Sequence, residues 1–275
     1  MTYDLSDPGE LESFLSRFGL FAKKSFGQNF LVDSRILDQI IESAELSGHD
    51  FVLEIGSGPG VLSQRIAPHV AQLTSLEIDL QMIAPWKVIM KEYENVSILN
   101  QDVLDFIPED KAYKVVANIP YYITSPILKH FLRSQRVRRP DLIVLLIQKE
   151  VAQRICDSKK PTLLSWEIRL FGTPEIICGV PPGSFSPSPK VDSAVLRIRM
   201  LPKPLLPSEH MDALFVLMSL AYKQPRKTLL NNLMNVGKWS KENIEITLEK
   251  CDIDLRFRPH QLNLAQWTDL LGILF

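Results

Sequence analysis

Apolar runs alternate with amphipathic stretches up to Ile147, and this alternation predicts the fold. The runs are short and continuous, which is typical of strands buried on both faces. Between them, apolar residues recur at helical spacing. We therefore expect an α/β fold in which helices cover both faces of a doubly wound, parallel sheet. The predicted strands span residues 51–55, 73–78, 96–99, 115–117 and 142–147, and the predicted helices span residues 34–44, 61–67, 81–93 and 126–133.

The ends of the chain follow other patterns. The first twenty residues are polar with scattered apolar positions, which predicts a mobile arm or a short helix. After Ile147 a helical pattern covers residues 150–171 and leads to two more strands, at 175–180 and 194–199. The proline-rich segment between these strands, residues 181–193, is expected to be a functional loop. Further helices are predicted at residues 211–222, 228–235, 241–250 and 262–274.

A proline-rich stretch at residues 200–210 has the composition of a linker. We therefore expect two domains with a boundary near residue 205. The larger domain would span residues 1–205, and a small, all-helical C-terminal domain would span residues 206–275.

The sequence LEIGSGPGVLS, residues 53–63, places glycines between the first predicted strand and the next helix. Glycine permits a tight turn and a close approach of the backbone to a ligand. Gly56, Gly58 and Gly60 give the spacing G-x-G-x-G, whereas the dinucleotide fingerprint needs G-x-G-x-x-G and has Val61 here instead. The spacing found is more typical of S-adenosylmethionine-dependent methyltransferases. A tight turn without a ligand is the alternative interpretation.

Carboxylates follow the next two predicted strands. Glu77 ends the strand of SLEID and could accept both hydroxyls of a ribose. Asp102 follows the third strand in NQDVLDF and could accept the amine of an adenine ring. Either acid alone could be a solvated residue at a strand end, but together with the glycine turn they predict a bound adenosyl group. The chain has no G-x-x-x-x-G-K-[ST] cradle for a triphosphate.

The fourth strand runs into Asn118-Ile119-Pro120-Tyr121, which predicts the methyl acceptor. The side-chain oxygen of Asn118 and a backbone carbonyl, that of Ile119, could hold the two N–H hydrogens of an adenine amine. This geometry favours a nitrogen whose lone pair points at the methyl group. Pro120 fixes the turn, and Tyr121 offers a face for stacking of the base. A proline turn beside a buried tyrosine is the alternative.

Composition excludes several classes of protein and of site. The hydrophobic fraction of 45% and the charged fraction of 23% are those of a globular protein. The longest apolar run, residues 142–147, is too short to cross a membrane, and the acidic N-terminus does not resemble a signal peptide, so we expect a cytoplasmic protein. Cys156, Cys178 and Cys251 form no C-x-x-C pair, so neither a metal site nor a disulfide is expected.

Taken together, these motifs resemble the ribosomal small-subunit RNA adenine dimethyltransferase family over nearly the whole chain. The segments that carry the resemblance are KKSFGQNFL, LEIGSGPGVLS, LEID, QDVLDF, ANIPYYITSPIL, QKEVAQRI, SFSPSPKVDSAV and PRKTLLNNL. The resemblance implies a Rossmann-like methyltransferase sheet with one inserted antiparallel strand, followed by a helical domain. It also implies transfer of two methyl groups from S-adenosyl-L-methionine to N6 of each of two adjacent adenosines, in a hairpin near the 3′ end of small-subunit (16S) rRNA, coupled to ribosome assembly.

The resemblance implies roles for individual residues. Asn29 and Leu31 of QNFL would touch the cofactor, and Phe185 of FSPSP would clamp the target adenine opposite Tyr121. The remaining cofactor residues would be Gly56, Gly58, Glu77, Asp102 and Asn118, and the catalytic residues would be Asn118, Ile119, Pro120, Tyr121 and Phe185. Ser57 departs from the proline or alanine of many members, without an expected effect on binding.

The expected partner is small-subunit rRNA within a pre-ribosomal small subunit, bound by a monomer, with no role in DNA or membrane binding. Lys plus Arg total 31 and Asp plus Glu total 32, so RNA contacts must come from local clusters. The candidates are Lys23, Lys24, Arg133, Arg136, Arg138, Arg139, Lys223, Arg226 and Lys227, with Arg256 and Arg258 nearby in sequence. Each cluster alone could be a solvated surface.

Three alternative functions stay open at this point. One is a large-subunit rRNA adenine N6-methyltransferase, which would share the glycine turn and an Asn-Ile-Pro-Tyr-like motif. Another is a DNA adenine methyltransferase, although no base-reading domain is evident. The third is a non-catalytic assembly or transcription factor on the same scaffold. KVDSAV and PRKTLLNNL favour the small-subunit rRNA family.

Overall fold

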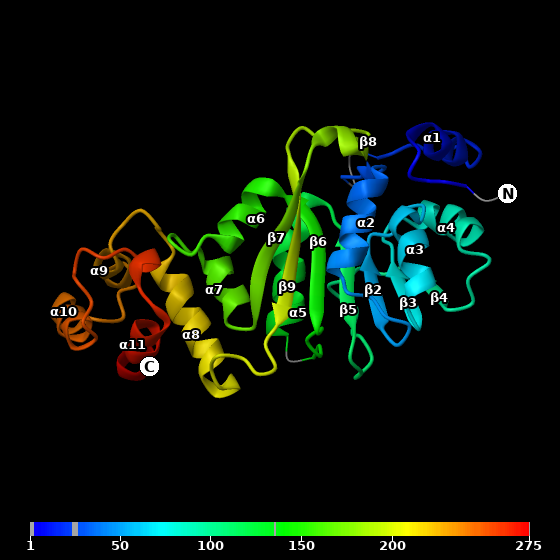
Figure 1. Ribbon diagram of the computed structural model, residues 1–275. Helices are drawn as coiled ribbons and strands as arrows, with labels where there is room; N and C mark the ends of the chain where they lie inside the picture. Colours follow the sequence, from blue (N-terminus) through cyan, green and yellow to red (C-terminus); the bar gives the residue numbers. More distant parts are fainter. Residues whose placement is uncertain (1–2, 24–26, 135, 275) are drawn as a thin grey trace. The chain divides into compact units, whose positions relative to one another are not determined.

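A seven-stranded mixed sheet forms the centre of the first of two compact units in the computed structural model, which describes residues 3–23, 27–134 and 136–274 (Figure 1). The strand order is β4-β3-β2-β5-β6-β9-β7. The strands are β2 (Phe51–Ile55), β3 (Gln72–Leu76), β4 (Val96–Leu99), β5 (Lys114–Asn118), β6 (Leu142–Gln148), β7 (Gly172–Val180) and β9 (Ser193–Met200).

The predicted α/β class is confirmed, with one qualification on strand direction. Strands β4, β3, β2, β5 and β6 are mutually parallel, as the alternation of runs predicts. Strand β9 is antiparallel to both β6 and β7, between which it lies. It is therefore the inserted antiparallel strand that the family resemblance implies.

Both faces of the sheet are buried, which explains the continuous apolar runs. In β6, Val144 and Leu146 join one core cluster with Leu37 and Ile40 of α2 (Ser34–Ser43). Alternate side chains of a strand point to opposite faces. Figure 1 shows α2 in front of the sheet and α5 (Thr124–Arg133) behind it. Helices α3 (Val61–Ile66) and α4 (Ile83–Ile89) follow β2 and β3, each after a turn at the carboxyl end of the strand.

The N-terminal residues are tied to this unit. Helix α1 (Pro8–Ser16) begins at the N-cap Asp7 and buries Leu11 and Phe14. Strand β1 (Phe30–Leu31) pairs in antiparallel fashion with β8 (Phe185–Ser186), so that Leu31 lies opposite Phe185. The segment QNFL thereby contacts the proline-rich loop that follows β7.

The second unit is helical and consists of Arg154–Phe171 and Leu201–Phe275. The predicted boundary near residue 205 instead assigned residues 154–171 to the larger domain. Within the second unit, Trp166 Nε1 donates to the Tyr222 hydroxyl at 3.2 Å, and the rings of Phe171 and Phe215 lie 6.2 Å apart. Its helices are α7 (Leu163–Arg169), α8 (Ser208–Ala221), α9 (Leu229–Met234), α10 (Lys241–Lys250) and α11 (Leu264–Leu274), while α6 (Lys149–Cys156) joins the two units.

No helix among the described residues is long and apolar enough to cross a membrane. Within the same residues, no group of three or more histidine, cysteine or acidic side chains is arranged to hold a metal ion.

Candidate active site

A cavity opens at the carboxyl edge of the parallel strands, where the sequence predicts the ligand. Because β2, β3, β4 and β5 are parallel, the residues that follow them meet at one edge. The predicted site residues that line the cavity are Asn29, Gly56, Gly58, Glu77, Asp102, Asn118, Ile119, Pro120 and Tyr121.

The glycine turn forms one wall of this cavity. The N–H of Gly56 donates to the carbonyl of Leu76 at 2.8 Å, which closes the turn onto β3. Gly58 has a φ of +54°, and a Cβ on it would lie only 2.8 Å from Cε1 of Phe30. Only glycine fits this position without strain or a shift of the Phe30 ring. The turn is therefore shaped by the contact with Phe30 of β1 as well as by backbone conformation.

Glu77 is held at the centre of the cavity wall. Its Oε2 accepts the N–H of Gly58 at 2.7 Å, and its Oε1 accepts the N–H of Asp79 at 2.8 Å. The side chain is 6% exposed, and burial raises its pKa although both backbone hydrogen bonds oppose this rise. Each carboxylate oxygen has a second lone pair, which leaves Glu77 able to accept hydroxyls of a ligand.

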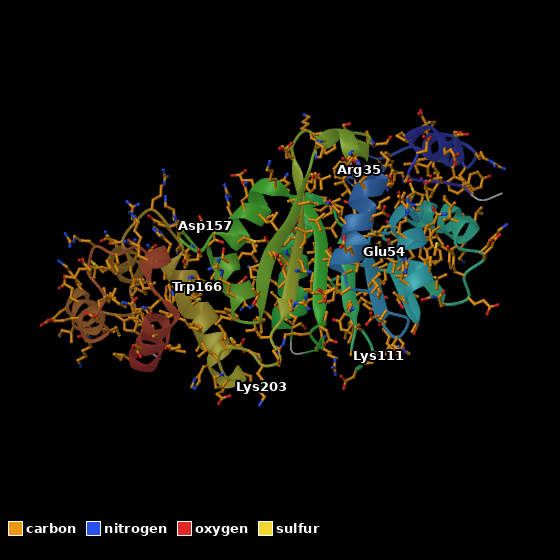
Figure 2. The ribbon with its side chains drawn as sticks, viewed as in Figure 1. Arg35, Glu54, Lys111, Asp157, Trp166 and Lys203 are labelled. Atoms are coloured by element: carbon orange, nitrogen blue, oxygen red, sulfur yellow. The ribbon has the colours of Figure 1, made fainter. Side chains whose placement is uncertain are left out.

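A second carboxyl group, that of Glu54 on β2 (labelled in Figure 2), lies close enough to Glu77 for their charges to interact. Its side chain is 1% exposed, and Oε2 accepts the hydroxyls of Ser63 and Ser75 at 2.5 and 2.6 Å. Ser63 also accepts the indole N–H of Trp86 at 2.8 Å. Burial raises the pKa of Glu54 to about 7, and the negative charge of Glu77 adds to the rise. Sequence analysis missed this network, since the signal was only a glutamate inside an apolar run.

Asn118 is oriented by the segment that contains β1. Its Nδ2 donates to the carbonyl of Asn29 at 3.1 Å, while Asn29 Nδ2 donates to the carbonyl of Gly27 at 3.0 Å. Since the amide nitrogen is engaged, the Oδ1 of Asn118 is the atom left to accept from a ligand. Asp102 is fixed by its own turn, in which Oδ1 accepts the N–H of Leu104 at 2.9 Å.

Tyr121 stands in a short turn between β5 and α5. The carbonyl of Pro120 accepts the N–H of Ile123 at 3.2 Å, and the carbonyl of Tyr121 accepts the hydroxyl of Thr124 at 3.1 Å. The hydroxyl of Tyr121 lies 2.6 Å from that of Ser193 at the start of β9. Partial burial raises the pKa of Tyr121, so the phenol is neutral at physiological pH. The ring is thus held at both ends.

Two predicted site residues do not line the cavity. Leu31 and Phe185 are 2% and 4% exposed and lie opposite each other in the β1–β8 pair. The geometry therefore gives Phe185 a packing role here and does not place it against Tyr121. Besides Tyr121, the aromatic residues that line the cavity are Phe30 and Tyr122, and Tyr122 is 70% exposed.

The basic candidates of the first unit differ in their surroundings. Lys23 Nζ lies 2.9 Å from Oδ2 of the buried Asp79, so its charge is already paired. Arg138 forms an ion pair with the exposed Asp110 at 3.5 Å. Arg133, Arg136, Arg138 and Arg139 are all exposed, whereas Lys24 lies outside the described residues.

In the helical unit, Lys223, Arg226 and Lys227 are exposed on one loop. The buried side chain of Asn232 organises this loop. Its Oδ1 accepts the N–H of Gln224 at 2.9 Å, and its Nδ2 donates to the carbonyls of Gln224 and Thr228 at 3.1 and 3.0 Å. The predicted basic cluster is therefore presented by a defined turn.

Known proteins match this chain in both sequence and structure. The profile of the ribosomal RNA adenine dimethylase family matches residues 19–274. A ribosomal RNA small subunit methyltransferase A of Leuconostoc mesenteroides is 39% identical over an alignment of 284 positions, which covers 98% of this chain and 95% of the relative. The protein of that name from Bacillus pumilus is 35% identical over 289 residues, which cover 100% of this chain and 98% of the relative.

Two solved structures share the fold. A dimethyladenosine transferase from Plasmodium falciparum has a TM-score of 0.74 at 26% identity and covers 88% of this chain and 95% of its own. The 23S rRNA methyltransferase ErmE has a TM-score of 0.71 at 27% identity and covers 90% of this chain and 99% of its own.

The sheet order, the glycine turn and the polar strand ends, together with these structural matches, define an S-adenosylmethionine-dependent methyltransferase. Within that class, the chain belongs to the ribosomal RNA adenine dimethylase family. The family resemblance inferred from the motifs is confirmed.

The cavity fits the cofactor of this class. It is lined by the carboxylates of Glu77 and Asp102, and no lysine or arginine is among its described lining residues. This composition suits an uncharged adenosyl group attached to a cationic sulfonium, and it offers no cation to a pyrophosphate. Glu77, Asp102 and Asn118 each have acceptor capacity that is not used within the described chain.

Proposed function

We propose that the protein transfers two methyl groups from S-adenosyl-L-methionine to N6 of each of two adjacent adenosines near the 3′ end of small-subunit rRNA. The observation that carries this proposal is the position of Asn118 and Tyr121 at the end of β5, in the wall of the cavity that fits the cofactor. This position brings acceptors for an adenine amine next to a cavity for the methyl donor.

The cofactor, when bound, supplies an electrophilic methyl group. Glu77 accepts the ribose hydroxyls, Asp102 accepts the adenine amine of the cofactor, and the residues of the glycine turn approach it with their backbone. Asn29 holds the amide of Asn118 so that Oδ1 faces the cavity. This pre-organisation reduces the entropy that must be lost when the reactants are brought together.

Asn118 Oδ1 and the carbonyl of Ile119 accept the N–H hydrogens of the target amine. These two hydrogen bonds favour a nitrogen with a localised lone pair, which is the nucleophile. Tyr121 stacks on the target adenine, and its contact with Ser193 fixes the plane of the ring. As the lone pair of the nitrogen bonds to the methyl carbon, the carbon–sulfur bond breaks. No strong base is required, because methylation makes the nitrogen acidic enough to release its proton to water.

The target adenosine must leave its helix to reach this cavity. The basic residues of both units therefore contact the phosphates that flank it, and the substrate is the assembling small subunit in the cytoplasm. We expect the enzyme to act as a monomer.

The test is methylation of purified small subunits from cells that lack the dimethyl marks, followed by nucleoside mass spectrometry. We expect dimethyladenosine as the end product and monomethyladenosine as an intermediate. Tyr121→Ala should retain cofactor binding and lose turnover. Methylation of large subunits alone would identify the protein as a large-subunit enzyme, and labelling of neither subunit would refute the proposal.

A further inference from the structure

Three loops of the helical unit meet around a cavity of about 350 Å³ that is separate from the active site. They are residues 157–163, residues 222–228 and residues 258–261. Pro161, Leu163, Tyr222 and Pro225 give the cavity an apolar lining, and Lys160 and His260 give it a polar one. We call it the loop pocket.

The apolar lining is rigid. The Tyr222 hydroxyl donates to the carbonyl of Pro161 at 2.8 Å and accepts the indole N–H of Trp166 at 3.2 Å. The Tyr222 ring also stacks on that of Trp267, with 6.2 Å between the ring centroids and an interplanar angle of 24°. A fixed aromatic surface binds a flat ligand at a small cost in conformational entropy.

Each loop carries a basic residue in or next to the lining. Lys160 of the first loop lines the pocket, Arg226 of the second follows the lining residue Pro225, and Arg258 of the third acts electrostatically on His260. Burial lowers the pKa of His260, and the charges of Arg258 and Lys160 add to this effect, which keeps the imidazole neutral. The acid of the first loop, Asp157, accepts the backbone N–H groups of Lys159 and Lys160 at 2.8 and 3.1 Å, so it positions that loop.

We propose that the loop pocket binds one nucleotide of the small-subunit rRNA, with its base against the apolar lining and its phosphate at Lys160. The proposal rests on the proposed function, because it requires an RNA substrate. An apolar cavity with a cationic rim matches the two chemical parts of a nucleotide, and aromatic stacking accepts any base. An acidic peptide would use the cations but not the apolar, aromatic lining.

Charge and cavity can be tested separately on undermethylated small subunits. Lys160→Ala removes a cation, and its control is Lys203→Ala, an exposed lysine of the same unit. Figure 2 shows Asp157, in the loop of Lys160, and Lys203 on opposite sides of this unit, with Trp166 between them. Ser219→Phe fills the pocket without a change in charge, because both side chains are uncharged. The hydrogen bond lost among the described residues is local to α8, from the Ser219 hydroxyl to the carbonyl of Val216. Val216→Phe places the same phenylalanine side chain on the same helix outside the pocket lining.

We expect Lys160→Ala to weaken subunit binding about fivefold. It should also lower the salt slope, which is the decrease in the logarithm of the binding constant per unit of the logarithm of salt concentration, by about one. Ser219→Phe should weaken binding at least about tenfold with an unchanged salt slope, since it removes a stacking contact. Both controls should bind like the unaltered protein, and all variants should keep cofactor affinity.

Full subunit binding by Ser219→Phe would overturn the proposal, as would equal losses in the two phenylalanine variants. Displacement of subunits by millimolar adenosine monophosphate, lost in Ser219→Phe, would reassign the pocket to free nucleotides. If the unaltered protein neither bound nor methylated subunits, the proposed function itself would fail.

Discussion

The single side chain of Glu77 joins two parts of the active site. It fixes the glycine turn through Gly58 and the following turn through Asp79, and it offers its remaining lone pairs to a ribose. We predict that Glu77→Ala weakens cofactor binding by about 1.5–3 kcal/mol, because charge-assisted hydrogen bonds are lost. Calorimetric titration with S-adenosylmethionine measures this change.

The matched control is Tyr121→Ala, which removes a larger side chain from the same cavity but none of these hydrogen bonds. Cofactor affinity in that variant should stay within about threefold of the unaltered protein, a difference below 1 kcal/mol. An unchanged affinity in the Glu77 variant would contradict the assigned role.

The buried carboxyl of Glu54 makes the free energy of unfolding depend on pH. Its folded-state pKa of about 7 lies above the ordinary value of 4.5, so between these pH values the folded state binds the proton and the unfolded state does not. This contribution to stability is therefore lost as pH rises from about 4.5 to about 7. Glu54→Gln should remove this pH dependence, and above pH 7 the free energy of unfolding of the variant should exceed that of the unaltered protein by up to about 3 kcal/mol.

Urea denaturation at pH 5 and pH 7.5 gives both free energies. The exposed Glu12 on α1 provides the control, since Glu12→Gln should leave the pH dependence unchanged. Parallel pH profiles for Glu54→Gln and the unaltered protein would show that Glu54 does not titrate in this range.

The sequence predicts the position of a site residue where chain geometry alone places the side chain. Glu77, Asp102 and Asn118 follow parallel strands, so their meeting at one edge follows from the sheet. Phe185 failed to reach the cavity because its position depends on the pairing of β8 with β1, two short strands distant in sequence. Short-range periodicity carries no information about such a pairing.

At the scale of secondary-structure elements, the apolar runs predicted strand positions to within a few residues, because burial on both faces leaves a local signal. The boundary between the two units was harder to predict. The pattern at residues 150–171 contains two helices, α6 and α7, and the second packs with the C-terminal helices through Trp166 and Phe171. Helical spacing identifies the buried face but not its partner.

The turn before α9 yields a prediction at this scale. Asn232 satisfies three backbone groups around residues 224–228, so Asn232→Ala should lower the free energy of unfolding by about 1–3 kcal/mol. The adjacent Asn231→Ala should change it by less than about 0.5 kcal/mol, because that side chain is exposed. Urea denaturation compares them, and equal losses would show that Asn232 does not anchor the turn.

For the whole molecule, a net charge of −1 requires that RNA binding come from segregated charges. Lys23 and Arg138 are paired with Asp79 and Asp110. By contrast, Arg226 and Lys227 form no ion pair with the described residues, and their loop is anchored. Cofactor binding and subunit binding should therefore be separable between the two units.

Neutralising the helical unit tests this division. The double substitution Arg226→Gln and Lys227→Gln should weaken binding to undermethylated small subunits. It should also lower the salt slope by up to about two, one for each lost phosphate contact. Cofactor affinity should not change, because neither residue lines the active-site cavity. Point substitutions are needed, since a chain cut at residue 205 would expose Trp166 and Phe171, which pack on residues beyond the cut. A double variant that methylates subunits at the full rate across the salt range would place recognition in the first unit, where Arg133, Arg136 and Arg139 are the exposed candidates.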